Sequence, residues 1–248
     1  MARWGTLRMA GRTVGPHFFR WRSYVPLAVL ALYLWVIYER GDGWRAHMPG
    51  PLWGIGGAAV RAVGLAIRVY AIGHAPAHTS DRNTRAQKAA TLNTTGAYAV
   101  LRHPLYVGNL LVGLGAALFG AVWWVVPVYV LAFCAFYVPI ALAEEDYLRE
   151  RFGDAFTAWA HRTPAIFPRP GNFTPPSLAF SWRRALREEH RSVITIVLVF
   201  FAMDVARTWA ADGHPGAHMV WMSLAVGATA TWVLLRLISR RTHLLRDR

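Results

Sequence analysis

One segment of the chain places basic, aromatic and hydrogen-bonding side chains directly before a long apolar run. Arg102 and His103 precede Pro104, whose missing N–H suits the first turn of a helix. Tyr106 and Asn109 follow three residues apart, so they share one face of that helix. The positive end of the helix dipole faces the same region. Such a cluster can hold an anionic group beside aromatic surface.

Two carboxylates follow at the end of a second apolar run, at Glu144 and Glu145. If the two runs form a membrane hairpin, these acids lie at the same membrane level as Arg102 and His103. One glutamate can pair with Arg102 as a structural salt bridge, which leaves the other for a positively charged ligand. Polar groups gathered at one membrane face are most often functional. An interfacial belt of basic and aromatic residues is the plainer alternative.

The composition indicates a membrane protein, because 55% of the 248 residues are apolar and 12 are Trp. A helix needs about 20 mostly apolar residues to cross the hydrocarbon. We therefore predict an all-α, polytopic membrane helix bundle with about six transmembrane helices and a cytoplasmic cofactor pocket. The spans are expected at Tyr24–Tyr38, Leu52–Ile72, Pro104–Gly120, Ala121–Ala143, Ser192–Ala211 and His218–Ile238.

The distribution of Lys and Arg predicts the orientation of these spans. The basic residues concentrate in segments 1–23, 73–103, 143–191 and 239–248, whereas the opposite loops carry few. The positive-inside rule then places both termini in the cytoplasm, and we expect an integral protein of a bacterial inner membrane. The net charge of +14 fits contact with anionic headgroups. Nucleic acid is not an expected partner, because apolar spans separate the charges.

The segment that begins with these two carboxylates is expected to continue outside the membrane. Glu144–Phe152 should extend the helix, Gly153 should stop it, and Asp154–Arg162 should form a second short amphipathic helix. Trp182–Arg191 is a basic amphipathic stretch, which we expect to lie along the membrane surface. The single Cys134 lies inside the fourth span, where we expect a buried apolar side chain.

Four further ionisable residues fall inside predicted spans. Arg61 and Arg68 are seven apart and share a helix face, which suits contact with a lipid phosphate. We expect Arg68 to reach the cytoplasmic interface, whereas Arg61 lies deeper and is the stronger functional candidate. Asp204 and Arg207, three apart, are expected to form a structural ion pair. The histidines show no ligand spacing, so no metal site is expected.

Taken as a set, these motifs resemble the isoprenylcysteine carboxyl methyltransferase and phospholipid methyltransferase superfamily. The similarity covers roughly residues 80–170 and comprises Gly96-x-Tyr98, Arg102-His103-Pro104-x-Tyr106-x-Gly108, Glu144-Glu145-x-x-Leu148, Phe152-Gly153-x-x-Phe156 and Pro164. The resemblance implies an integral membrane methyltransferase that uses S-adenosylmethionine. It also implies three parts: 1–73 with two membrane helices, 74–176 as the methyltransferase core, and 177–248 with the closing hairpin.

The resemblance also implies a set of cofactor-binding residues. In such enzymes Tyr98 and the run His103–Tyr106 border the cofactor, and Glu144 binds its amino end. The expected set is Asn83, Thr91, Leu92, Asn93, Tyr98, Arg102, His103, Pro104, Tyr106, Gly108, Asn109, Glu144 and Glu145. Methyl transfer mainly requires alignment of donor and acceptor. We therefore assign no catalytic base; Arg102 and His103 are the nearest candidates.

The acceptor is expected to be a lipid or lipidated molecule, with Arg61 and Ile140 as the candidate substrate residues. The prenylcysteine enzymes carry an arginine at the position of Ile140, so a phospholipid is an alternative acceptor. Two other functions stay open. The first is a membrane reductase that uses NADPH, because such reductases share the Arg-His-Pro-x-Tyr run. The second is a non-enzymatic membrane protein such as a transporter, which Arg61, Asp204 and Arg207 favour because they lie inside predicted spans.

Overall fold

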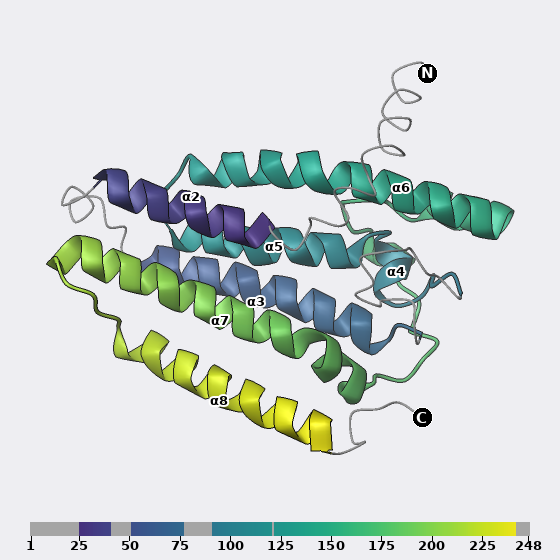
Figure 1. Ribbon diagram of the computed structural model, residues 1–248. Helices are drawn as coiled ribbons and strands as arrows, with labels where there is room; N and C mark the ends of the chain where they lie inside the picture. The colour runs from purple at the N-terminus through teal and green to yellow at the C-terminus, as the bar shows by residue number, and fades with distance from the viewer. Residues whose placement is uncertain (1–24, 41–50, 77–90, 121, 242–248) are drawn as a thin grey trace.

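The computed structural model describes residues 25–40, 51–76, 91–120 and 122–241, and every regular element in them is helical. The elements are α2 (Val25–Arg40), α3 (Pro51–Gly73), α4 (Ala97–Val100), α5 (Pro104–Phe119), α6 (Val125–Arg162), η3 (Pro170–Asn172), α7 (Trp182–Asp212) and α8 (Met219–Arg241). Six long helices run side by side in alternating directions (Figure 1). The ends of α3 and α6 and the start of α5 therefore meet beside α4. This confirms the predicted all-α bundle.

Three of these helices are long and apolar enough to cross a membrane within the described residues. They are α3 over Trp53–Gly73, α6, and α7 over Trp182–Ala210. Shorter apolar stretches cover Pro104–Phe119 in α5 and Met219–Leu234 in α8. Each of the six predicted spans coincides with one of the six long helices. The fold is thus consistent with a membrane helix bundle.

The expectation that Trp182–Arg191 is separate from the following span is wrong, because α7 runs from Trp182 to Asp212 as one helix. The Ser181 side chain caps its start by accepting a hydrogen bond from Arg184 N at 3.3 Å. The basic residues of the first turns therefore continue the membrane helix. The expected burial of Cys134 is also wrong: its side chain is exposed on the outer face of α6.

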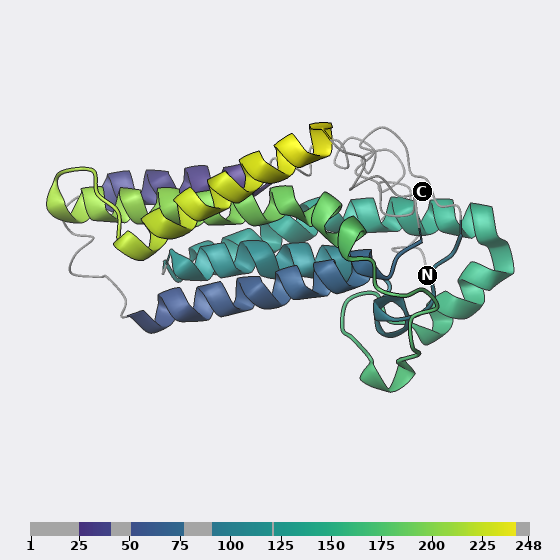
Figure 2. The ribbon, with the colours of Figure 1, turned by 90° about the horizontal axis from the view of Figure 1, so that it is seen from below.

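The long helix α6 bends at Gly153, where φ is +53° and ψ is −123°. A β-carbon is disfavoured in this conformation, so glycine is the suitable residue at the bend. The bend confirms the predicted break between two helical pieces, and Figure 2 shows the end of α6 folding back toward α4. Beyond it, Phe156 is fully buried, and Trp159 Nε1 donates a hydrogen bond to Tyr98 O at 3.0 Å.

Glycines bring α3 and α5 into close backbone contact. Gly57 and Gly64 on α3 face Gly115 and Gly108 on α5, and in each helix the two are seven residues apart. A β-carbon at Gly64 would lie 2.7 Å from Gly108 O and 2.8 Å from Val112 N. Small residues permit such close packing between membrane helices, so these positions fix α3 against α5.

We expect Gly64→Ala to lower the melting temperature of the purified protein by several degrees. The added methyl group meets backbone that has to move, and overpacking costs about 1–3 kcal/mol. Gly56→Ala is the matched control on the same helix, because a β-carbon there meets nothing within 4 Å. Since alanine favours a helix over glycine, this control should be neutral or slightly stabilising. Equal melting temperatures for the two variants would contradict the close contact.

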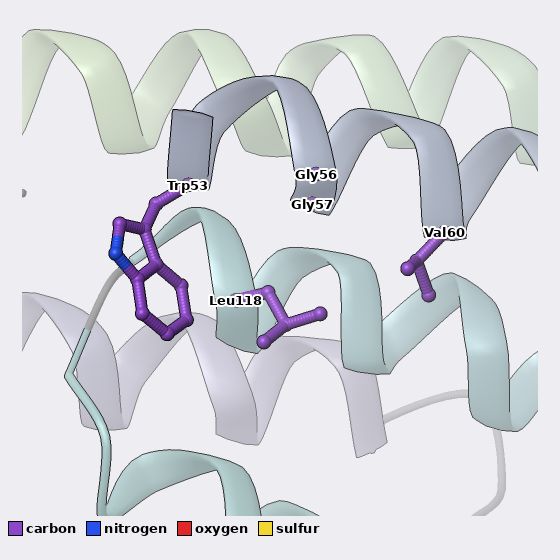
Figure 3. Close-up of a pocket in the computed structure, with 5 residues that line it drawn as sticks. All are labelled: Trp53, Gly56, Gly57, Val60 and Leu118. Atoms are coloured by element: carbon purple, nitrogen blue, oxygen red, sulfur yellow. The ribbon is translucent and has the colours of Figure 1, made fainter. Parts of the chain in front are cut away.

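An apolar hollow lies between the start of α3 and the end of α5, as Figure 3 shows. Its lining residues are Trp53, Gly56, Gly57, Val60 and Leu118. The hollow lies at the end of the bundle opposite to α4. None of its lining residues is a predicted cofactor ligand, so this hollow is separate from the cluster at the α4 end.

Candidate functional site

The start of α5 and the part of α6 that carries Glu144 and Glu145 meet at the α4 end. Tyr106, in the first turn of α5, donates a hydrogen bond from its hydroxyl to Glu144 Oε2 at 2.6 Å. The His103 ring stacks on Tyr106 with centroids 5.4 Å apart. Pro104 occupies the first turn of the helix, as predicted, and is buried. The expected juxtaposition of these two helix ends is therefore confirmed.

The two adjacent glutamates have different surroundings. Glu145 Oε1 lies 3.0 Å from Arg102 Nη1 and 3.0 Å from His103 Nε2, and its side chain is 10% exposed. The Glu144 side chain is 36% exposed, and its Oε2 lies 3.9 Å from His103 Nδ1. Glu145 is thus the structural partner of the two basic groups. Glu144 keeps carboxylate surface that a ligand can reach.

Glu145→Gln should lower the melting temperature by about 6–12 °C. Removing one partner of a buried ion pair costs about 3 kcal/mol, and each kcal/mol moves the midpoint by about 2–4 °C in a protein of this size. Glu150→Gln, at an exposed position of the same helix, is the control and should leave the melting temperature unchanged within error. A Glu145→Gln protein as stable as that control would contradict the structural role.

Tyr98 on α4 closes the same cluster. Burial raises the pKa of its hydroxyl well above the ordinary value, the nearby Glu144 carboxylate raises this pKa further, and Arg68 opposes the shift. The hydroxyl therefore stays protonated at neutral pH and can donate a hydrogen bond. Both charged groups act on this hydroxyl electrostatically, so Tyr98 lies near a carboxylate and a guanidinium.

The segment around α4 is held by the chain that follows α6. Arg102 N donates to Pro164 O at 2.9 Å, and Gly96 N donates to Thr174 O at 2.9 Å. Gly96 has φ +60°, a conformation that glycine tolerates best. These bonds fix the backbone on both sides of Tyr98. They position it without using its side chain.

The remaining predicted cofactor residues are more scattered. Thr91 is exposed, whereas Leu92 and Asn93 are partly buried and lie upstream of α4. Asn93 Oδ1 accepts a hydrogen bond from Thr95 N at 3.3 Å, which shapes the local turn. Asn83 lies outside the described residues. Their part in a site stays a prediction.

Asn109 and Gly108 contact Arg68, which the sequence did not place at the site. Arg68 Nη1 donates to Asn109 Oδ1, and Asn109 Nδ2 donates to Tyr137 OH at 3.4 Å. A β-carbon at Gly108 would lie 2.5 Å from Arg68 Cγ, so this glycine makes room for the arginine. Gly108 therefore has a packing role between α3 and α5.

Arg68 does not reach out to the membrane interface as expected. It forms a two-point ion pair with Glu189 of α7, with Nη2 to Oε1 at 2.5 Å and Nε to Oε2 at 3.2 Å. Glu189 is 2% exposed. A carboxylate partner offsets the cost of partly burying this guanidinium, and the carboxylate comes from a helix far along the chain. In the sequence, only the acidic residues in the otherwise basic start of α7 indicated a partner for a buried arginine, and they do not identify Arg68 as that arginine.

The two predicted substrate residues lie apart from this cluster. Ile140 is fully buried one turn before Glu144, so a substrate contact there would require the local packing to change. Arg61 is 5% exposed, and its guanidinium lies 4.5 Å from the centroid of the Phe200 ring. Within the described part of the chain, its Nε and Nη1 have no hydrogen-bond partner.

The expected ion pair between Asp204 and Arg207 is not formed. Asp204 instead accepts from His218 N at 2.7 Å, and its Oδ1 lies 2.9 Å from His218 Nδ1. Arg207 stacks over the Phe119 ring at 5.4 Å. The turn between α7 and α8 brings His218 back to α7, and this tertiary contact replaces the local pair. Among the described residues, no group of three or more His, Cys, Asp or Glu could hold a metal ion.

The helices that carry most of this cluster also carry a family match. Residues 53–155 match the family model of the phospholipid methyltransferases. Over this segment the resemblance inferred from the sequence is confirmed. The segment contains Arg68, Tyr98, Tyr106 and both glutamates, and it supports a membrane methyltransferase. Glu189 lies beyond it.

Two relatives align over part of the same chain. The cobalt-zinc-cadmium resistance protein CzcN of Cupriavidus metallidurans is 42% identical over 83 residues, which is 34% of this chain. The nickel-cobalt-cadmium resistance protein NccN of Alcaligenes xylosoxydans xylosoxydans is 41% identical over 93 residues, 37% of this chain. The alignments cover only 38% and 42% of those proteins, less than half of each. No solved structure shows a significant match.

Proposed function

We propose that this chain is an integral membrane methyltransferase that uses S-adenosylmethionine and methylates a lipid or lipidated acceptor at the cytoplasmic leaflet. The observation that carries the proposal is the unequal pair of glutamates at the α4 end. Glu145 is occupied by Arg102 and His103, whereas Glu144 is partly exposed beside Tyr106. A partly exposed carboxylate next to aromatic surface suits an amphiphilic, positively charged ligand.

The residues of the cluster fit the charged groups of this cofactor. Glu144 would hold the ammonium of its methionine part. Arg102 would hold the carboxylate, because its Nε is buried and has no partner among the described residues. The faces of Tyr106 and Tyr98 suit a sulfonium by cation–π attraction. When bound, S-adenosylmethionine supplies the methyl group through that sulfonium.

The chain's own contribution is alignment rather than proton transfer. His103 is engaged by Glu145 and stacks on Tyr106, so it positions the tyrosine and the first turn of α5. Holding the reactants in line removes much of the entropic barrier to a displacement. We therefore assign a positioning role to His103 and a binding role to Arg102, and neither is assigned as a catalytic base.

A phospholipid-type acceptor is better supported than a prenylcysteine. The family model that matches is that of the phospholipid methyltransferases, and Ile140 offers no charge to a substrate carboxylate. The candidate site lies where the membrane helices α3, α5 and α6 end, so a lipid headgroup can reach it without leaving the bilayer.

Calorimetry on the detergent-purified protein tests the cofactor assignment. We expect S-adenosylhomocysteine to bind with micromolar affinity and NADPH not to bind. Binding of NADPH alone would support a membrane reductase instead, and binding of neither would support a non-enzymatic protein. Transfer of an isotope-labelled methyl group into total lipid extract, followed by mass spectrometry, would then identify the acceptor.

A further inference from the structure

A segment of exposed apolar side chains follows α6 at the α4 end. We call residues 163–182 the proline-rich loop; it contains η3 and leads into α7. Phe167 is 82% exposed and Trp182 is 69% exposed. The other large apolar residues of the loop that are exposed are Ile166, Phe173 and Leu178. Several large exposed apolar side chains within one loop favour an interaction site there.

The loop has one basic residue, Arg169, and Arg183 follows it in the first turn of α7. Between Thr163 and Arg187 the sequence contains no Asp or Glu. Arg169 and Arg183 are exposed, whereas Arg184 is used internally, donating to Ala75 O. The available charge is therefore positive and lies beside the exposed aromatic rings.

Hydrogen bonds hold this loop in place, so the apolar exposure does not result from fraying. Arg169 N donates to Val100 O at 3.0 Å, and Ser181 N donates to Gly73 O at 2.8 Å. The Phe180 ring packs between His74, at 5.2 Å, and Trp182, at 4.6 Å. The bond to Gly73 fixes one end of the loop at the last residue of α3. Figure 2 shows the loop projecting to the side of the bundle there.

We propose that the proline-rich loop docks on the anionic lipid leaflet at the α4 end of the bundle. Because α3 is a membrane span, its last residue lies near the headgroups, and the loop attached there lies at the same depth. Aromatic side chains favour this interfacial region. Phe167 and Trp182 enter it, and Arg169 and Arg183 contact lipid phosphates.

Docking has a consequence for the neighbouring cluster. The loop is bonded to Val100 and, through Pro164, to Arg102. Lipid contact on the loop therefore steadies the backbone that carries Tyr98 and Arg102. The docking inference itself rests on the membrane spans and on the loop, and it stands whether or not the site transfers a methyl group.

A fluorescent label on the loop tests this proposal. An environment-sensitive probe is attached to Phe167→Cys in a Cys134→Ala background, and the full chain is placed in nanodiscs of phosphatidylcholine with or without phosphatidylglycerol. We expect blue-shifted emission and about threefold weaker quenching by aqueous iodide in the anionic discs. Replacing Arg169 and Arg183 together by Gln should remove most of the difference between the two lipids.

The same probe at Ala158→Cys is the control, because Ala158 is exposed on the part of α6 beyond Gly153. Its quenching should be equal in both kinds of disc. The proposal fails if the Phe167 probe is quenched as strongly as this control in anionic discs. It also fails if shielding requires high protein concentration in detergent, because a second copy of the chain would then be the partner.

Discussion

Glu144→Gln is expected to weaken binding of S-adenosylhomocysteine about 10- to 150-fold, because a hydrogen bond to a charged group contributes about 1.5–3 kcal/mol. The amide keeps the size of the carboxylate and one acceptor oxygen, but it loses the negative charge that the ligand ammonium would meet. The melting temperature should change little, since the Glu144 side chain is 36% exposed. Calorimetry and thermal melting in the same detergent check both parts.

Two other variants sharpen this prediction. Glu150→Gln, at an exposed position on the same helix, should bind the ligand as the wild type does. Tyr106→Phe removes the donor that lies 2.6 Å from Glu144 and should give a smaller loss than Glu144→Gln. If the wild type and Glu144→Gln bind S-adenosylhomocysteine with equal affinity, the chain uses this cofactor but its ammonium group binds at another residue.

The sequence predicted much of the fold because local chemistry determines it. Apolar runs located the six long helices, and Pro104 marked the start of α5. Gly153 marked the bend in α6, because a single residue without a side chain is enough to permit positive φ. The error at Trp182 has a tertiary cause: Glu189 is buried against α3, and this contact keeps the first turns of α7 in the bundle.

The candidate site was predictable where its residues lie on neighbouring helices joined by a short turn. The hairpin of α5 and α6 forces His103 and Tyr106 to meet Glu144 and Glu145. The residues alone predicted that one glutamate would pair with Arg102, and the structure shows that this is Glu145. Which of the two takes this place depends on the rotation of α6 about its axis, which is determined by packing.

The contact between Arg68 and Glu189 could not be predicted, because the partners are 121 positions apart. Nothing in either local sequence states that α7 packs against α3. An arginine near the end of a membrane span is equally compatible with an extended side chain that reaches water. Gly108, recognised by its motif, has a packing reason that becomes visible only when Arg68 lies over it.

Glu189→Leu is expected to lower the melting temperature by about 6–20 °C. The substitution leaves the Arg68 guanidinium in the bundle without its carboxylate, and removing one partner of a buried ion pair costs about 3–5 kcal/mol. Arg68 also donates to Asn109, which in turn donates to Tyr137. We therefore expect the loss to loosen the packing of α3 and α5 as well as that of α7.

The double variant Arg68→Met with Glu189→Leu tests whether the lost stability comes from an unpaired buried charge or from altered packing. It removes both charges, and well-packed apolar replacements of a buried ion pair are often neutral or stabilising. We therefore expect most of the lost melting temperature to return. Glu188→Leu is the matched control, because its partner Arg187 is 38% exposed, and its effect should be small. A double variant as unstable as Glu189→Leu would show that shape, and not the uncompensated charge of Arg68, explains the loss.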